Sequence, residues 1–357
     1  MTHIKKDKMG TDPILKLIIS MSLPSMFSMV VQALYNVVDS IFVAQISEDA
    51  LTAVSLAFPV QLLLVAVAVG TGIGLNSFIS RKIGQKNIEE ANHAASHGII
   101  LAIFSYIFFA IFGIFFCKPF FSLFTHNTTI IKLATDYTSC ICIISLPVLI
   151  QSNIEKTLQA TGNMIYPMIF QLIGAITNII LDPILIFGLL GFPRLGVFGA
   201  AVATVTGQLF SMIYTLYVTF YKEHAVKITF KDFKLNFYII KKIYAVGFPS
   251  IIMQSISCVM VTILNAILIS KSETAVSVLG IYYKVQSFVF MPIWGLTHGV
   301  MPIMGYNFGA GNKNRLMETL KLSCLIAAII LSLSTIIFFT VPDKIMLLFN
   351  PSNNMMS

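Results

Sequence analysis

Two aspartates interrupt long apolar segments of the sequence, Asp39 in YNVVDSIFVAQI and Asp182 in TNIILDPILIF. A charged side chain at the centre of a bilayer costs about 2.5–3.5 kcal/mol, so an ionisable residue there normally faces a cavity or a partner. Both segments are predicted to run from the inner to the outer side, which puts each aspartate about 10–12 Å below the outer surface. Two carboxylates at matching depth suit a site that alternates between a protonated and a cation-bound state.

Polar residues share the helical faces of the two aspartates. Gln32 and Tyr35 precede Asp39 by seven and four residues, and Asn178 precedes Asp182 by four. Residues at these spacings lie on the same side of a helix, so each aspartate is predicted to have polar neighbours. A structural alternative stays open, in which each aspartate is a hydrogen-bonded buried group that only holds helices together.

Prolines stand in the same two helices. Pro24 precedes Asp39 within the first apolar segment, and Pro183 directly follows Asp182. Proline removes a backbone donor from a helix, so we expect both helices to bend and to leave carbonyl oxygens free for a cation or proton network.

Other ionisable residues are weaker candidates. Lys284 lies three turns into a predicted helix, where it either responds to the coupling cation or extends its ammonium group to the outer interface. His298, in the glycine-rich GLTHGV stretch, is either a proton-sensing group or a local hydrogen-bonding residue. Glu155 and Lys156 fall at the predicted inner end of a helix, and we expect both to be solvated.

No nucleotide-binding motif, phosphate loop, metal cluster or catalytic triad stands in the sequence. This disfavours an ATP-driven pump and a membrane enzyme, and no cofactor or metal is expected. The cysteines lack CxxC or His/Cys ligand spacing and are interpreted as apolar packing residues. They are Cys117, Cys140, Cys142, Cys258 and Cys324.

The chain as a whole has the composition of a polytopic membrane protein. Of its 357 residues, 57% are hydrophobic and 11% charged, and the mean hydropathy is +0.86, whereas a soluble domain has about 25% charged residues. Apolar runs near the roughly 20 residues that span a bilayer recur throughout, so none stands out as a cleavable signal. We predict an all-α fold with nine transmembrane helices, at about 14–45, 51–80, 92–117, 131–156, 164–190, 197–221, 239–270, 275–305 and 316–341.

The basic residues indicate the orientation of these helices. With the N-terminus in the cytoplasm, seventeen lysines and arginines fall on the inner side and five on the outer side. Such an excess is typical of cytoplasmic loops. The net charge of +8 therefore reflects membrane topology and does not indicate nucleic-acid binding.

The sequence contains an internal repeat. A polar segment from Lys222 to Lys242 divides the chain after six predicted helices, and an even number of helices returns each copy to the same side. We therefore expect two six-helix lobes that are parallel repeats, with domains at 1–221 (N-terminal lobe), 222–238 (cytoplasmic linker) and 239–357 (first three helices of the C-terminal lobe). A shift of 225 residues lays LPS at 23–25 on FPS at 248–250 and places Gly70, Gly74, Gly84 and Asn87 on Gly295, Gly299, Gly309 and Asn312.

The repeat has two further consequences. Asp39 falls on Leu264, so the fold itself does not require a carboxylate at this position, which favours a functional role. A second copy as long as the first would end near residue 446, at about three helices beyond the present end. Nine of an expected twelve helices are then present, and the chain is either a fragment or a naturally shortened protein.

Several stretches together resemble the multidrug and toxic compound extrusion (MATE) family. They are LPSMFSMVVQALYNVVDSIFVA, ISRKIGQKN, LQATGN followed by NIILDPILIFG, and GVMPIMGYNFGAGN. The resemblance covers essentially the whole chain and is closest to the bacterial branch of DNA-damage-inducible and multidrug export proteins. It implies a twelve-helix antiporter in two lobes that expels organic cations or other amphipathic compounds in exchange for inward H⁺ or Na⁺.

The resemblance also implies roles for individual residues. Asp39 looks like the coupling carboxylate of helix 1, and Asn178 and Asp182 look like the polar pair of helix 5. Pro24 falls at the helix 1 proline associated with bending. Other members carry acidic residues in the second lobe, where helix 7 of this chain offers only Gln254.

The predicted function is a cation-coupled antiporter of the cytoplasmic membrane that exports organic cations or drugs, with H⁺ or Na⁺ as the coupling ion. Its expected partners are a small amphipathic or cationic substrate and membrane lipid, without nucleic acid or nucleotide. One alternative is a flippase for lipid-linked saccharides, a class that tends to line its cavity with several basic residues. Another is a non-transporting, truncated fragment.

Overall fold

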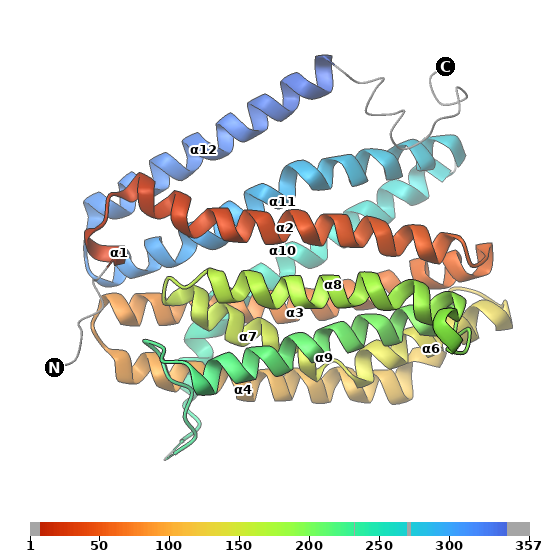
Figure 1. The fold of residues 1–357 in the computed structure, drawn as a ribbon, viewed down its shortest axis with the longest axis horizontal. Coiled ribbons are helices and arrows are strands. Elements are labelled where there is room, and N and C mark those ends of the chain that lie inside the picture. The colour runs from red at the N-terminus through yellow and green to blue at the C-terminus, as the bar shows by residue number, and fades with distance from the viewer. Residues whose placement is uncertain (1–7, 232, 270–272, 341–357) are drawn as a thin grey trace.

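The computed structural model describes residues 8–231, 233–269 and 273–340, and this part of the chain contains helices and connecting segments but no β-strand. The long helices run side by side along one direction (Figure 1). The predicted all-α class is thereby confirmed for the described residues. The helices are α1 (Lys8–Thr11), α2 (Ile14–Ala44), α3 (Glu48–Gly84), α4 (Ile88–Ile111), η1 (Phe112–Phe116), α5 (Cys117–Ser122), α6 (Thr128–Ile143), α7 (Leu146–Ala160), α8 (Ile165–Phe187), η2 (Leu189–Gly191), α9 (Val197–Tyr221), α10 (Phe237–Ile269), α11 (Glu273–Gly309) and α12 (Lys313–Thr340).

Local sequence signals set where several helices begin and end. Ser47 Oγ accepts the backbone N–H of Ala50 at 3.1 Å, and Asn87 Oδ1 accepts that of Glu90 at 3.1 Å. These caps satisfy first-turn N–H groups that have no partner within the helix. At the end of α8, Gly188 adopts φ +75°, a left-handed conformation that glycine reaches without steric cost.

Six helices of the described chain are long and apolar enough to cross a membrane, or seven if a bent pair counts as one span. The bent pair is α6 and α7, whose axes differ by 47°. The sequence predicts one helix over about 131–156, whereas the structure has two, because the chain breaks at Ile144 and Ser145, just before Pro147 at the start of α7. The count of nine spans stays a prediction.

The prolines near the two aspartates lie inside continuous helices. Pro24 belongs to the 31-residue α2 and Pro183 to the 23-residue α8. Their positions agree with the sequence analysis, and the expected bends remain predictions about other states of the protein.

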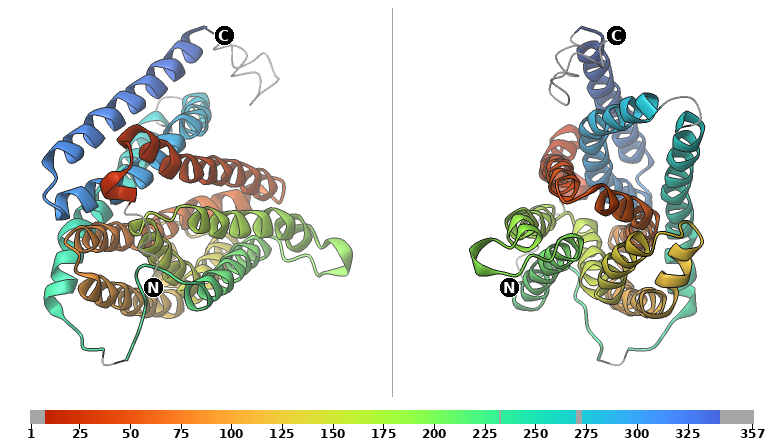
Figure 2. Two further views of the ribbon diagram at one scale, coloured as in Figure 1. Left: turned by 60° about the vertical axis from the view of Figure 1, so that its left-hand side comes forward. Right: turned by 90° about the vertical axis from the view of Figure 1, so that its right-hand side faces the viewer.

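The segment between α9 and α10 divides the chain, and we call α1 to α9 the first half and α10 to α12 the second half (Figure 2). The two halves meet where α3 packs against α10 and where α11 packs against α2 and α3. We call the end of the bundle near residues 85–87 and 310–312 the inner end, since it is the end predicted to face the cytoplasm.

Glycines bring the backbones of the two halves into contact in this inner part. Gly84 of α3 lies against Tyr306 of α11, and Gly309 of α11 lies against Arg81 of α3, so that a Cβ atom at either glycine would collide with a backbone carbonyl. The two contacts are related by the 225-residue shift, which places Gly84 on Gly309 and Arg81 on Tyr306. The same shift relates two more pairs of contacts, Gly70–Ile251 with Gly295–Met26 and Gly74–Gly247 with Gly299–Ser22. The inner interface is therefore approximately two-fold symmetric.

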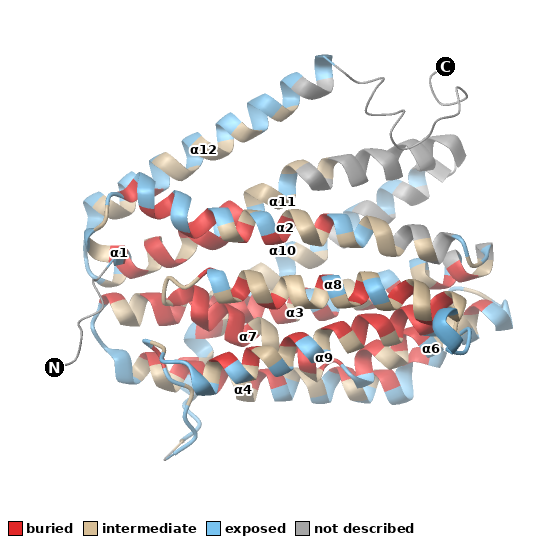
Figure 3. Ribbon diagram, in the orientation of Figure 1, coloured by how far each residue is buried: buried red, intermediate tan, exposed pale blue. Residues whose placement is uncertain are grey.

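Among the residues whose burial is described, the buried ones concentrate in the first half of the molecule (Figure 3). One cluster of apolar side chains joins α3, α4, α5, α6 and α9, and a second joins α2 to α11. In contrast, only 11% of the most apolar 18-residue stretch of α12 is buried. The first half thus has its own core, in which polar groups can be held in fixed positions.

The close approach of the two halves predicts the effect of Gly74→Ala. Its Cβ atom would collide with the backbone carbonyl of Ile243, and overpacking of this kind typically costs about 1–3 kcal/mol. We expect a lower melting temperature for the purified protein in detergent. Gly174→Ala is the matched control, because its Cβ atom would lie 3.7 Å from the nearest backbone atom, an ordinary contact. Equal melting temperatures for the two variants would contradict the prediction.

Candidate cation-coupling site

Helices α2, α8 and α9 pack together around the two aspartates. Gly199 of α9 lies against the backbone of Leu185, and Gly207 lies against the carbonyl of Gly174, so α8 and α9 approach unusually closely. Asp182 is completely buried in this packing. Asp39 of α2 is half-buried and completes the site from the third helix.

The carboxyl groups of Asp39 and Asp182 lie close enough to hydrogen-bond to each other. The Oδ1 atoms of both residues are buried and have no hydrogen-bond donor. Two carboxylates in contact repel each other strongly unless they share a proton or a cation lies between them. The pair therefore has the geometry and the unsatisfied oxygens of a site for a proton or a small cation.

Asn178 connects the aspartates to α9. Its amide is best satisfied with Nδ2 donating to Asp182 Oδ2 at 2.7 Å and with Oδ1 accepting from the Thr204 backbone N–H and hydroxyl, both at 3.1 Å. Tyr35 of α2 hydrogen-bonds with the Thr204 side chain. The amide thus leaves one carboxylate oxygen of Asp182 satisfied and the other available.

A second tyrosine faces the site from α6. The Tyr137 hydroxyl donates to Gln61 Oε1 at 3.4 Å, and the ring lies within electrostatic reach of both aspartates. Sequence reasoning missed Tyr137 and Thr204. Hydroxyl-bearing residues are frequent in these helices, and only the rotation of each helix shows which ones face the carboxylates.

The structure does not bring every predicted residue to the aspartate pair. Gln32 is half-buried on α2, two turns before Asp39. Gln254 Nε2 points back to the carbonyl of Ser250 on its own helix at 3.4 Å. The side chain of Lys284 lies outside the described residues. His298 is buried elsewhere, within electrostatic reach of Lys156 on α7.

The expectation that Glu155 and Lys156 are solvated is wrong. Their exposed fractions are 5% and 3%, because α7 is enclosed by α3, α4, α8 and α9 at this point. The sequence predicts both residues at the inner end of a helix, but this end belongs to α7, a separate helix whose inner part is covered on most sides.

The chemistry of the aspartate site is that of oxygen donors. Neither aspartate takes part in an ion pair among the described residues. Within the same part of the chain, no group of three or more His, Cys, Asp or Glu side chains is arranged to hold a metal ion. Carboxylate, amide and hydroxyl oxygens suit a proton or a hard cation better than a transition metal.

The family of this protein follows from a comparison with family models. The MatE model matches residues 24–184 and 249–357, which together are most of the chain. The chain belongs to the MatE family. Members of this MATE family are membrane transporters, which agrees with the apolar helices and with the aspartates buried among them.

Relatives and solved structures agree with this assignment. The chain is 29% identical to an FAD transporter of Shewanella oneidensis, over 89% of this chain and 71% of that protein. It is 26% identical to the multidrug export protein MepA of Staphylococcus haemolyticus, over 94% of this chain and 74% of that protein. A multidrug resistance MATE transporter solved in its outward-facing conformation matches with a TM-score of 0.89 and 28% identity, covering 98% of this chain and 77% of that one.

The hydrogen bonds of Thr204 predict the effect of its replacement. Thr204→Val keeps the shape of the side chain but removes the hydroxyl that links Tyr35 to Asn178. Leaving such a buried polar group without its partner costs about 1–3 kcal/mol. We expect weaker protection of the protein by the coupling ion, measured as the shift in melting temperature when Na⁺ is added or the pH is lowered.

Thr204→Ser is the control for this variant, because serine retains the hydroxyl. It should respond to the ion as the unchanged protein does. An identical response from Thr204→Val would show that the hydroxyl does not support the site.

Proposed function

We propose that this chain is the core of a cation-coupled antiporter of the cytoplasmic membrane, which exports organic cations or other amphipathic compounds in exchange for H⁺ or Na⁺. The contact between the Asp39 and Asp182 carboxyl groups is the observation that carries this proposal. A buried acidic pair without a basic partner attracts a cation, and a drug cation and a coupling ion then compete for the same negative charge.

The proposed cycle uses this competition. With the outer side open, a proton or Na⁺ binds between Asp39 and Asp182 and removes the charge that retains a cationic substrate. The substrate leaves to the outside, and the neutralised pair permits α2 to bend near Pro24 and the inner side to open. There the ion dissociates, and the restored negative charge binds the next substrate.

The packing of the two halves supports an outward-open arrangement of the present structure. The symmetric glycine contacts close the halves against each other in the inner half of the bundle. The first step of the cycle requires, in addition, that the aspartate pair is reached from the outer side.

FAD is a second candidate substrate, because one relative of this chain is named for its transport. A relative that matches 89% of this chain is named an FAD transporter, and FAD is an anionic dinucleotide rather than an organic cation. Export of such an anion would need a basic partner for the pyrophosphate in addition to the acidic pair. FAD therefore belongs in any panel of substrates tested with this protein.

The proposal predicts that Asp39→Asn abolishes coupled efflux while the protein still inserts into the membrane. Asparagine is neutral and nearly isosteric, so it removes the charge for which ion and substrate compete. The measurement is efflux of a fluorescent organic cation from cells, with the amount of membrane-inserted protein determined in parallel. Glu318→Gln is the matched control, since Glu318 is an exposed carboxylate on α12. Unchanged efflux by Asp39→Asn would refute the role of the carboxylate.

A second experiment identifies the coupling ion and the substrate class. Proteoliposomes containing the protein are loaded with a fluorescent cation or with FAD, and either an H⁺ or an Na⁺ gradient is imposed. We expect efflux of the cation to follow one of the two gradients and to stop when that gradient is collapsed. Efflux of FAD alone would replace the drug assignment, and no gradient-dependent efflux of any compound would favour a non-transporting chain.

A further inference from the structure

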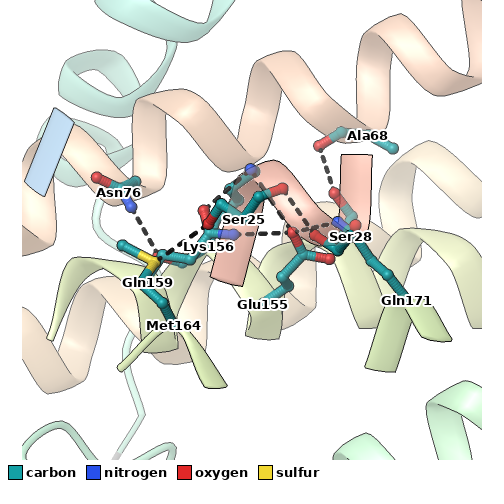
Figure 4. Close-up of polar contacts among 10 residues, drawn as sticks. Ser25, Ser28, Ala68, Asn76, Glu155, Lys156, Gln159, Met164 and Gln171 are labelled. Carbon is teal, nitrogen blue, oxygen red and sulfur yellow. Dashed lines mark hydrogen bonds and ion pairs between the residues drawn. The ribbon is translucent and has the colours of Figure 1, made fainter. Parts of the chain in front are cut away.

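Helix α7 carries a second set of buried charged side chains (Figure 4). Glu155, Lys156 and Gln159 have exposed fractions of 5%, 3% and 2%. Gln171 of α8 joins them and lies about three turns before Asp182 on the same helix, roughly 16 Å along its axis. The two sites therefore share α8 but are separate.

The hydrogen bonds around Glu155 describe an ionised carboxylate. Its Oε1 atom accepts from Gln159 Nε2 at 2.9 Å and from Gln171 Nε2 at 3.0 Å, and it lies 3.6 Å from Lys156 Nζ. Lys156 Nζ also donates to Gln159 Oε1 at 3.0 Å. Gln159 thus connects the two charges from its position four residues after Glu155, and the cluster as a whole is electrically neutral.

Lys156 reaches toward the interface between the two halves. Its side chain crosses α3 at Gly72, where a Cβ atom would lie 2.6 Å from Lys156 Cγ. Asn76 of α3 fixes the backbone at the same point, because its Nδ2 donates to the Lys156 carbonyl at 3.1 Å. Glycine at position 72 is therefore what admits a lysine side chain to this buried position.

His298 approaches the same lysine from the second half. It stands on α11, which packs against α7, and its exposed fraction is 8%. The ring lies within electrostatic reach of Lys156, and its Nδ1 atom is buried without a hydrogen-bond partner. Buried oxygens of Asn76 and Gln171 are likewise without a donor. The inner contact between the halves thus contains a charge cluster with unsatisfied polar atoms.

Among the described residues, Lys156 of the same helix is the charged group that acts on Glu155. His298 of α11 lies within electrostatic reach of Lys156. Toward the cluster, α2, α3 and α8 present the neutral residues Ser25, Ser28, Asn76 and Gln171. The charge state of this region therefore depends on Glu155, Lys156 and His298.

We propose that Glu155 is a second proton-binding site of the protein and that its occupancy is linked to the opening of the inner end. This inference rests on the proposed function, since it requires two halves that alternate between conformations. When Glu155 is ionised it neutralises Lys156, and α11 can close over the pair with a neutral His298. When a proton from water binds Glu155 Oε1, Lys156 keeps a positive charge without a counter-charge at a dry interface. Separation of the halves then allows water to solvate the ammonium group.

Spin labels on the two halves test the proposal without requiring transport. They are placed at Gln85 and Lys313, two exposed positions at the inner end, in a variant whose five native cysteines are replaced by serine. The measurement is the distance distribution between the labels in lipid nanodiscs as the pH is lowered. For the labelled protein we expect a shift from the short to the long distance on acidification.

Glu155→Gln imitates the protonated carboxyl group. We expect it to lower the ratio of closed to open protein by roughly tenfold or more at neutral pH and to remove the pH dependence. The double variant Glu155→Gln/Lys156→Met removes both charges and should return the closed state, again without pH dependence. A role in packing alone predicts no such rescue, because the double variant perturbs the site more than the single one.

Each remaining outcome counts against the proposal. It is overturned if Glu155→Gln stays closed, if the double variant resembles the single one, or if neither variant inserts. Asp39→Asn serves as the control for the other site and should retain the Glu155-dependent shift. Loss of efflux in Asp39→Asn and loss of the distance change in Glu155→Gln are separate observations, so failure of either proposal is recognised by itself.

Discussion

The contact between two carboxyl groups inside an apolar bundle is the constraint on which the rest of this structure depends. Asp39 and Asp182 repel each other strongly when both are ionised, unless a proton or a cation joins them. Their helices must therefore be held in fixed rotation. The close packing of α8 and α9 at Gly199 and Gly207 provides this, since it places Thr204 and Asn178 against Asp182.

The glycine contacts between the two halves are symmetric, but the position of Asp39 is not. The glycine contacts of the inner interface occur in pairs related by 225 residues, whereas Asp39 has Leu264 at the equivalent position. Symmetric contacts allow the two halves to separate and close as similar bodies. Ion binding at the acidic pair of the first half can then bias that motion.

The sequence identifies those residues of the site that are charged or polar within apolar segments. Asp39, Asp182 and Asn178 stand out because charged or amide groups are costly in a membrane segment. Thr204 and Tyr137 do not stand out, because their role depends on helix rotation and on glycines in a neighbouring helix. The sequence predicts a solvated Glu155 and Lys156 because both fall at the inner end of a predicted helix. Their burial depends on the 47° break before α7 and on Gly72, neither of which has a local signal strong enough to identify it.

The two acidic sites differ in how their charge is balanced, and this difference determines what each can bind. Asp39 and Asp182 have no basic partner among the described residues, so their combined negative charge attracts a proton, Na⁺ or a cationic substrate alike. Glu155 is already balanced by Lys156, which repels other cations and leaves a proton as the ligand that changes its state. In the proposed cycle Na⁺ would thus act at the aspartate pair only, whereas H⁺ would act at the aspartate pair and at Glu155. A transporter driven by Na⁺ would consequently still sense pH through its inner interface.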